Sequence, residues 1–145
     1  MGVIILKNEA FPWLPVVVGV LSILIGAVAF KTKWLDPSRR WLLVIVGAIC
    51  VTIGLRGMAS RVELHEDKIV QEVVTLTTKR NETRLTDVTK VTIVEEYDDG
   101  GTVQLWLFYH GKDLAKSFRP AAVWLDHKSE IVAYLRKRGI EVEGA

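Results

Sequence analysis

The chain has 145 residues, of which 50% are hydrophobic and 25% are charged, and its formal net charge at pH 7 is +2. So small a positive charge argues against a nucleic-acid-binding protein, and a single cysteine excludes both an internal disulfide and a thiolate metal site. The mean hydropathy is nevertheless positive, at +0.26, because the apolar residues are concentrated before residue 60. The sequence therefore predicts a membrane part, residues 1–60, and a soluble domain, residues 61–145, which is long enough for one small core.

Two uncharged segments of the membrane part predict transmembrane helices. Residues 10–30 contain no charged side chain, and a helix needs roughly 20 apolar residues to cross a bilayer core of about 30 Å. The second segment, residues 41–55, is shorter, so it spans only if it continues to about residue 59 with Arg56 reaching the headgroups. We expect spans over about 10–30 and 41–59. A cleaved secretory signal is the alternative, because Ala-Val-Ala at residues 27–29 resembles a cleavage site.

Small residues recur on both predicted helices, in each case at steps of three, four and three. This spacing places them on one helix face, and small faces allow helices to approach closely in lipid. We expect an intramolecular helix hairpin, although glycine is common in membrane helices and such faces also suit a helix of another subunit. The residues are Gly19, Ser22, Gly26 and Ala29 on the first helix and Gly47, Cys50, Gly54 and Gly57 on the second.

The loop between the spans, residues 31–40, holds four cations and one acid. If this positive loop faces the cytoplasm, as positive loops usually do, the soluble domain lies outside. The opposite ends of the spans also carry cations, among them Lys7, Arg56 and Arg61, so the two counts nearly balance. Charge alone therefore leaves the orientation open.

The soluble domain has the pattern of an antiparallel β protein that ends in a helix. Runs rich in Val, Thr, Ile and Leu between turn residues predict strands, and Asp-Asp-Gly-Gly at residues 98–101 predicts a hairpin. Asp126 can cap a final amphipathic helix. The pattern predicts an α+β fold, a β-sandwich or half-open barrel capped by a C-terminal helix. The expected strands are residues 62–64, 69–78, 83–85, 91–97, 103–109 and 114–118.

The order of these elements is similar to that of a known family. The matching features are the opening helix hairpin, the pattern Leu-x-Asp-Val-x-x-Val at residues 85–91, and the final helix after Pro120. Over nearly its whole length the chain resembles the bacterial pleckstrin-homology-like (PH-like) membrane proteins. The resemblance implies a seven-stranded, helix-capped domain, usually cytoplasmic, that acts in binding or scaffolding. We therefore expect a multi-pass protein of the bacterial inner membrane with a cytoplasmic domain.

The sequence offers few candidates for chemistry. In relatives of the resembled fold, basic residues in the first hairpin hold inositol phosphates, but Glu66 and Asp67 occupy that turn here. The cluster Lys79, Arg80 and Arg84 is a candidate contact for anionic headgroups, with a solvated turn as the alternative. The histidines lack the spacing of metal ligands, and no nucleophile motif or phosphate loop occurs. We expect no catalytic residue, no metal and no cofactor.

The predicted strand at residues 103–109 is apolar on both faces. Trp106 and Phe108 lie on one face, and Val103, Leu105, Leu107 and Tyr109 lie on the other. One face must supply the core. Either the strand is covered on both faces, or Trp106 and Phe108 contact a partner or the membrane surface.

These features together predict a non-enzymatic, membrane-anchored interaction module. The first hypothesis is an accessory or scaffolding subunit of a larger membrane complex, for which an energy-transducing or photosynthetic assembly is one host. Its expected partners are the lipid bilayer and other membrane-protein subunits, and not nucleic acid. The alternative is a PH-like domain that senses anionic lipid at the membrane surface. An accessory protein of a membrane protease is a third hypothesis.

Overall fold

The computed structural model describes residues 2–8, 13–98 and 100–144, and the chain forms two compact units. The helical unit comprises Asn8–Ser60 together with Val73–Lys79. The β unit comprises Met1–Lys7, Arg61–Glu72 and Arg80–Ala145. The predicted division after residue 60 is therefore crossed twice, since the first seven residues belong to the β unit and residues 73–79 belong to the helical unit.

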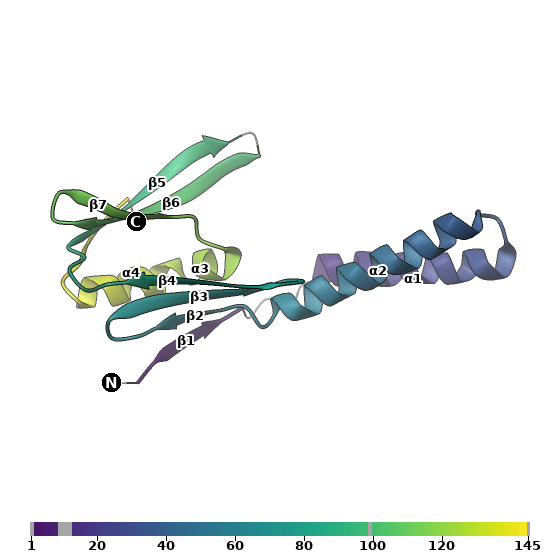
Figure 1. Cartoon of the computed structure of the whole chain (residues 1–145), viewed down its shortest axis with the longest axis horizontal. Helices are drawn as coiled ribbons and strands as arrows, with labels where there is room; N and C mark the ends of the chain where they lie inside the picture. Colours follow the sequence, from purple (N-terminus) through teal and green to yellow (C-terminus); the bar gives the residue numbers. More distant parts are fainter. Residues whose placement is uncertain (1, 9–12, 99, 145) are drawn as a thin grey trace. The chain divides into compact units, whose positions relative to one another are not determined.

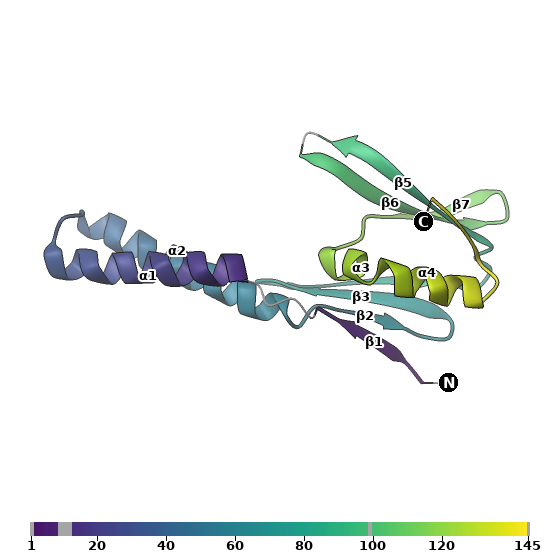
Figure 2. The ribbon, with the colours of Figure 1, turned by 180° about the vertical axis from the view of Figure 1, so that it is seen from behind.

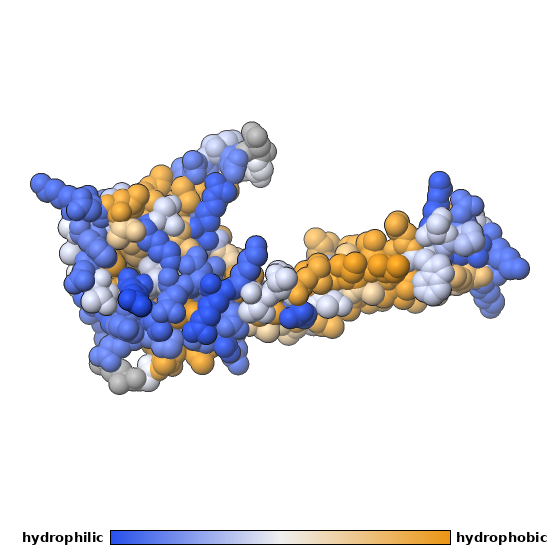
Figure 3. Space-filling model, viewed as in Figure 1, coloured by the Kyte–Doolittle hydropathy of each residue, from blue (hydrophilic) through white to orange (hydrophobic). Residues whose placement is uncertain are grey.

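The helical unit contains two antiparallel helices, α1 (Trp13–Thr32) and α2 (Pro37–Gly57). Both are long and apolar enough to cross a membrane, and Figure 3 shows hydrophobic residues along them with hydrophilic residues at the connecting loop. Pro37 stands in the first turn of α2, where a missing N–H costs no helical hydrogen bond. The first predicted span was expected to begin near residue 10, but residues 9–12 lie outside the described residues.

The β unit contains two four-stranded sheets (Figures 1 and 2). The first has the order β1-β2-β3-β4 and the second the order β7-β6-β5-β8. In the first sheet β1 pairs with β2 and β2 with β3 in antiparallel fashion, whereas in the second β8 pairs with β5 in parallel. Two short helices, α3 (Ala122–Asp126) and α4 (Lys128–Lys137), precede β8. The strands are β1 (Ile4–Lys7), β2 (Arg61–Leu64), β3 (Lys68–Val74), β4 (Thr78–Arg84), β5 (Lys90–Asp98), β6 (Gly101–His110), β7 (Asp113–Phe118) and β8 (Glu141–Glu143).

The tip between β3 and β4 is bonded to the end of α2 within the helical unit. The backbone N–H of Val74 donates to Ser60 Oγ at 2.9 Å, and Arg56 Nη1 donates to the Leu76 carbonyl oxygen at 3.1 Å. Ser60 is buried, so its hydroxyl satisfies a backbone group that would otherwise be costly to bury. The end of α2 and the β3–β4 tip therefore form one structure.

Strand β1 was not predicted from the sequence. It pairs with β2 from Ile4↔Leu64 to Lys7↔Arg61, and the alternation of its residues directs Leu6 into the core, where only 6% of it is exposed. Because β1 precedes α1 and β2 follows α2, the helix hairpin is inserted between two neighbouring strands of one sheet.

The core of the β unit lies between its two sheets and its two short helices, α3 and α4. The two largest fully buried side chains are Trp106 of β6 and Trp124 of α3, whose rings meet edge to face at a centroid distance of 5.2 Å. Phe118 of β7 packs against the same Trp124 ring at 4.8 Å. Edge-to-face pairs contribute about 0.5–1.5 kcal/mol each beyond their burial, so Trp124 fixes α3 against the second sheet. Other core residues are Val62, Leu64, Ile69, Val91, Ile93, Phe108, Ile131 and Leu135.

Two apolar helices followed by two sheets and a short C-terminal helix agree with the predicted α+β layout. The C-terminal helix is divided in two, and Asp126 is the last residue of α3, so the prediction that it caps the final helix is wrong. His127 occupies the N-cap position of α4, without a capping side-chain hydrogen bond. Strand β4 is also longer than the predicted strand at residues 83–85, because its polar residues join the sheet through the backbone while all their side chains except that of Thr83 stay exposed.

We expect that the β unit folds as a soluble domain when β1 is joined directly to β2. The backbone N–H of Asn8 donates to the Ser60 carbonyl oxygen, so this pair can flank a two-residue turn. Replacing residues 9–59 by Asn-Gly supplies such a turn. The joined β unit should have a higher melting temperature, measured by circular dichroism, than residues 61–145 alone, because that fragment lacks β1 and the buried Leu6. Equal melting temperatures would show that β1 contributes nothing to the sheet.

Candidate functional site: interaction surfaces

The two helices approach most closely at Gly19 and Gly47. A Cβ atom added to Gly19 would lie 2.6 Å from the Gly47 carbonyl oxygen, and one added to Gly47 would lie 2.6 Å from the Gly19 carbonyl oxygen. Backbone atoms cannot retreat as a flexible side chain can, so only glycine permits this crossing. Two further close contacts flank it, but with side chains: an added Cβ would lie 2.8 Å from a Val44 methyl group at Gly26 and 2.9 Å from a Val16 methyl group at Gly54. The hairpin is thus held by backbone proximity, as membrane helices that lack a hydrophobic driving force require.

The other members of the two small-residue faces lie at the interface or at its margin. Ala29 is buried, whereas Ser22 and Cys50 are half-buried. The Ser22 hydroxyl donates to the Val18 carbonyl oxygen of its own helix, at 2.8 Å. Gly57 is different, because an added Cβ would meet nothing within 4 Å. Gly57 therefore does not contribute a close helix contact.

Aromatic and basic residues gather at the loop end of the hairpin. Phe30 of α1 and Trp41 of α2 meet edge to face, with ring centroids 5.2 Å apart, and the Arg40 guanidinium lies 5.8 Å from the Phe30 ring centroid. Arg40 Nε also donates to the Leu35 carbonyl oxygen. Aromatic rings and arginines are typical of the ends of membrane helices, where one part of the side chain is apolar and the other is hydrated.

The predicted basic cluster lies on β4, and all three side chains are exposed. Lys79 belongs to the helical unit, whereas Arg80 and Arg84 belong to the β unit. Arg80 and Arg84 share one face of the strand with Glu82 between them, because side chains alternate along a strand. A hydrogen bond from Lys68 lowers the pKa of the Glu82 carboxyl from its ordinary value, and the charges of Arg80 and Arg84 act in the same direction.

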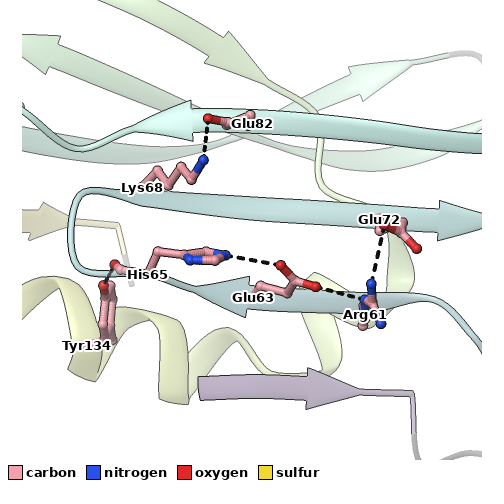
Figure 4. Close-up of polar contacts among 7 residues, drawn as sticks. All are labelled: Arg61, Glu63, His65, Lys68, Glu72, Glu82 and Tyr134. Carbon is pink, nitrogen blue, oxygen red and sulfur yellow. Dashed lines mark hydrogen bonds and ion pairs between the residues drawn. The ribbon is translucent and has the colours of Figure 1, made fainter. Parts of the chain in front are cut away.

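A ladder of polar contacts covers the outer face of the first sheet (Figure 4). The Glu63 carboxylate lies between Arg61, at 2.9 Å, and His65, at 3.0 Å. Lys68 Nζ donates to Glu82 Oε1 at 2.9 Å. Beneath these side chains Val70, which pairs opposite Glu63, is 0% exposed, so the aliphatic stems of the charged residues cover it. Over β2 and β3 this face is therefore charged and hydrated, whereas Ile5 of β1, which pairs opposite Glu63, is 48% exposed on it.

Trp106 and Phe108 do not form an exposed surface. Both are 0% exposed and belong to the core, which corrects the hypothesis that they contact a partner or the membrane. The physical reason is that α3 covers this face of β6 with Trp124. The outer face of the second sheet is the opposite one, where Leu105, Leu107 and Tyr109 are only half-buried. The sequence could not distinguish these faces, because both are apolar.

Lys116 makes a contact with β4 that the sequence did not predict. From β7 its Nζ donates to Asn81 Oδ1 at 2.8 Å and to the Glu82 carbonyl oxygen at 2.6 Å, both on β4. It thereby joins the second sheet to the first, and burial lowers its pKa from the ordinary lysine value. Residues 35 positions apart make this contact, so no local pattern signals it.

Two of the three histidines, His65 and His127, make polar contacts that account for their positions. His127 Nε2 lies 2.8 Å from the Lys7 carbonyl oxygen and its Nδ1 lies 2.8 Å from Glu130 Oε1, so it links α4 to β1. Tyr134 of α4 donates to the carbonyl oxygen of His65, and burial raises the pKa of this tyrosine. Among residues 2–8, 13–98 and 100–144, no group of three His, Cys, Asp or Glu side chains could hold a metal ion.

We expect that Gly47→Leu disrupts the helix hairpin, because the added side chain collides with the Gly19 backbone. Gly57→Leu is the matched control on the same helix, since its Cβ meets no atom. Thermal unfolding of the full chain in mild detergent should show a lower melting temperature for Gly47→Leu, by about 1–3 kcal/mol in stability, and little change for Gly57→Leu. Equal losses would mean that the close approach at Gly19 and Gly47 does not hold the hairpin.

Comparisons with known proteins do not assign a function to these surfaces. No family model, no curated protein and no solved structure matches this chain. The resemblance to bacterial PH-like membrane proteins therefore stays a prediction, and the function is argued from the contacts described above.

Proposed function

We propose that this protein is a non-enzymatic, membrane-anchored interaction module that serves as an accessory or scaffolding subunit of a larger membrane complex. The observation that carries this proposal is the insertion of the helix hairpin between β1 and β2, which are paired neighbours in one sheet. In the sequence, β1 precedes α1 and β2 follows α2. A membrane-spanning hairpin would therefore hold this unit at the membrane surface through two connections.

The helices support a role among other membrane subunits. Their small residues are used for contact with each other, and large apolar side chains such as Leu14, Leu42 and Ile45 point outward. In a bilayer these outward side chains meet either lipid or helices of other subunits. The outer face of the second sheet adds a partly exposed apolar surface, made by Val94, Leu105 and Leu107. The protein thus offers contact surfaces in both units.

A purification from the native host tests this proposal. The full chain carrying an affinity tag, extracted in mild detergent, should retain other membrane proteins in fixed stoichiometry through a second, size-based separation. Recovery of the protein alone under conditions that leave unrelated membrane complexes intact would contradict the proposed subunit role. The Gly47→Leu variant should lose partners that bind the intact hairpin, whereas Gly57→Leu should keep them.

Lipid sensing is the second candidate, and the exposed pair Arg80 and Arg84 favours it. Each cation near an anionic surface contributes about 1 kcal/mol, although Glu82 lies between these two. Flotation of the Asn-Gly-joined β unit with phosphatidylserine vesicles decides between the two functions. Binding that is lost in Arg80→Ala/Arg84→Ala supports lipid sensing, whereas its absence favours the subunit role.

We further propose that the protein lies in the bacterial inner membrane with a PH-like β unit in the cytoplasm. The resemblance supports this side, and the near balance of cations at the span ends gives the loop charges little weight against it. In intact cells, a Ser38→Cys variant should then react with an impermeant maleimide, and a Gly100→Cys variant should not. Both variants carry Cys50→Ala, since Cys50 is the one native thiol. Labelling of Gly100→Cys with Ser38→Cys protected would place the β unit outside.

A further inference from the structure

The far half of β5 has no strand on one of its two edges. β6 pairs with all of β5, from Lys90↔Tyr109 to Asp98↔Gly101. On the other edge β8 pairs only from Lys90↔Glu141 to Thr92↔Glu143. Gly144 then adopts a φ of +75°, which turns the backbone out of the strand conformation. Gly144 still lies against the Ile93 carbonyl group, and from Val94 to Asp98 no strand within the described part of the chain covers this edge.

The register identifies the backbone groups that point outward there. The Glu141 N–H donates to the Thr89 carbonyl oxygen at 3.1 Å, which in the parallel pairing of Lys90 with Glu141 places the backbone groups of Val91 on the edge that faces β8. Along a strand, the N–H and C=O groups of successive residues point alternately to its two edges. The N–H and C=O groups of Glu95 and Tyr97 therefore point along the line that β8 would follow if it continued. Tyr97 itself is 88% exposed, so no element of the described part of the chain packs over its side chain.

A pocket opens on the inner face of the same hairpin. Its volume is about 460 Å³, and its lining includes Glu95, Gln104, Pro120, Leu125 and Lys128. Glu95 and Gln104 are cross-strand partners on the face that carries Ile93 and Trp106 further along. Gln104 Oε1 is buried without a hydrogen-bond partner, and the amide nitrogen of Gln104 makes only a long contact of 3.5 Å with Glu95 Oε1. Buried acceptors without donors are uncommon and costly.

The hydrogen-bond acceptors at the pocket favour a basic occupant. The Glu95 carboxylate and Gln104 Oε1 are both hydrogen-bond acceptors, so a side chain with several N–H donors would satisfy them together. Arg119 does not supply these donors, because its guanidinium pairs with Glu96 and Asp98 at 3.6 Å and 3.4 Å. Lys128 lines the pocket wall and can donate to a carbonyl oxygen of an incoming backbone. An extended peptide with an arginine or lysine supplies both the donors and that carbonyl.

We propose that the uncovered edge of β5 binds an extended segment of a partner subunit, whose backbone pairs with Glu95 and Tyr97 and whose arginine or lysine side chain enters the pocket beside Glu95 and Gln104. This proposal rests on the proposed function and names the surface and the chemistry of the partner. Strand addition of this kind obtains affinity from backbone hydrogen bonds and specificity from the pocket.

The test measures binding of labelled peptides to the full chain in detergent micelles by fluorescence anisotropy. The probe is the pentapeptide threonine-valine-arginine-valine-threonine, blocked at both ends. One matched peptide has glutamate in place of arginine, and a second has alternate backbone nitrogens methylated so that it cannot pair as a strand. We expect the arginine peptide to bind and both matched peptides to bind at least tenfold more weakly.

Variants of the protein locate the binding edge. Glu95→Gln should weaken binding of the arginine peptide by about tenfold, because a charged hydrogen bond is lost. Glu96→Gln removes the same charge from the opposite face of the strand and should change the affinity less than twofold. Tyr97→Pro removes an outward N–H while leaving the pairing with β6, and it should also weaken binding. Unchanged circular dichroism and melting temperature would show that each variant is folded.

The outcomes separate this proposal from the proposed function. Absence of peptide binding, equal binding by the methylated peptide, or equal binding by Glu95→Gln would each overturn the β5 edge as the docking site. If partners nevertheless remain bound to Glu95→Gln and Tyr97→Pro during purification in mild detergent, the subunit role stands and uses another surface. If the wild-type chain retains no partner, the proposed function fails whatever the peptides show.

Discussion

The pairing of β1 with β2 is the constraint on which the rest of the chain depends. Lys7 and Arg61 lie opposite each other in the sheet, although the whole helix hairpin separates them in the sequence. Closing so long a loop has an entropic cost. The antiparallel packing of α1 and α2 brings the start of one helix beside the end of the other, so only short connections remain to be closed. Helix packing and sheet pairing therefore support each other.

The glycines at the helix crossing act through this same constraint. In lipid, apolar side chains gain nothing by leaving their surroundings, so association depends on close packing. The mutual contact of Gly19 and Gly47 brings the two backbones together, so the start of α1 and the end of α2 lie on the same side of the hairpin. At that side, Ser60 and Arg56 bond the β3–β4 tip. A loss of close packing at the crossing would therefore disturb the end of α2, where Arg56 and Ser60 make these hydrogen bonds, and β2, which follows α2 in the sequence.

Local patterns predicted the elements that carry a long or repeated signal, and they missed those that depend on a distant partner. The two helices, the hairpin at residues 98–101 and the small-residue faces were readable because hydrophobic runs, turn residues and spacing are local. Strand β1 reads as Ile-Ile-Leu-Lys before a span, and β8 is the short Glu-Val-Glu, so each becomes a strand only through its pairing. The face of β6 was ambiguous because both faces are apolar, and α3, which covers one of them, decided the outcome.

Within the β unit, the backbone groups at the sheet edges differ in whether a side chain from another element contacts them, and this difference bears on function. Unpaired strand edges invite association with other strands, so proteins usually cover or charge them. On β4 the Glu82 carbonyl oxygen is taken by Lys116, and on β1 the Lys7 carbonyl oxygen contacts His127. Each is a side chain brought from another element to a backbone group. The far half of β5 has exposed acidic residues and Tyr97 instead. Acidic side chains on an edge disfavour pairing with a second copy of the same edge and favour a segment that carries positive charge.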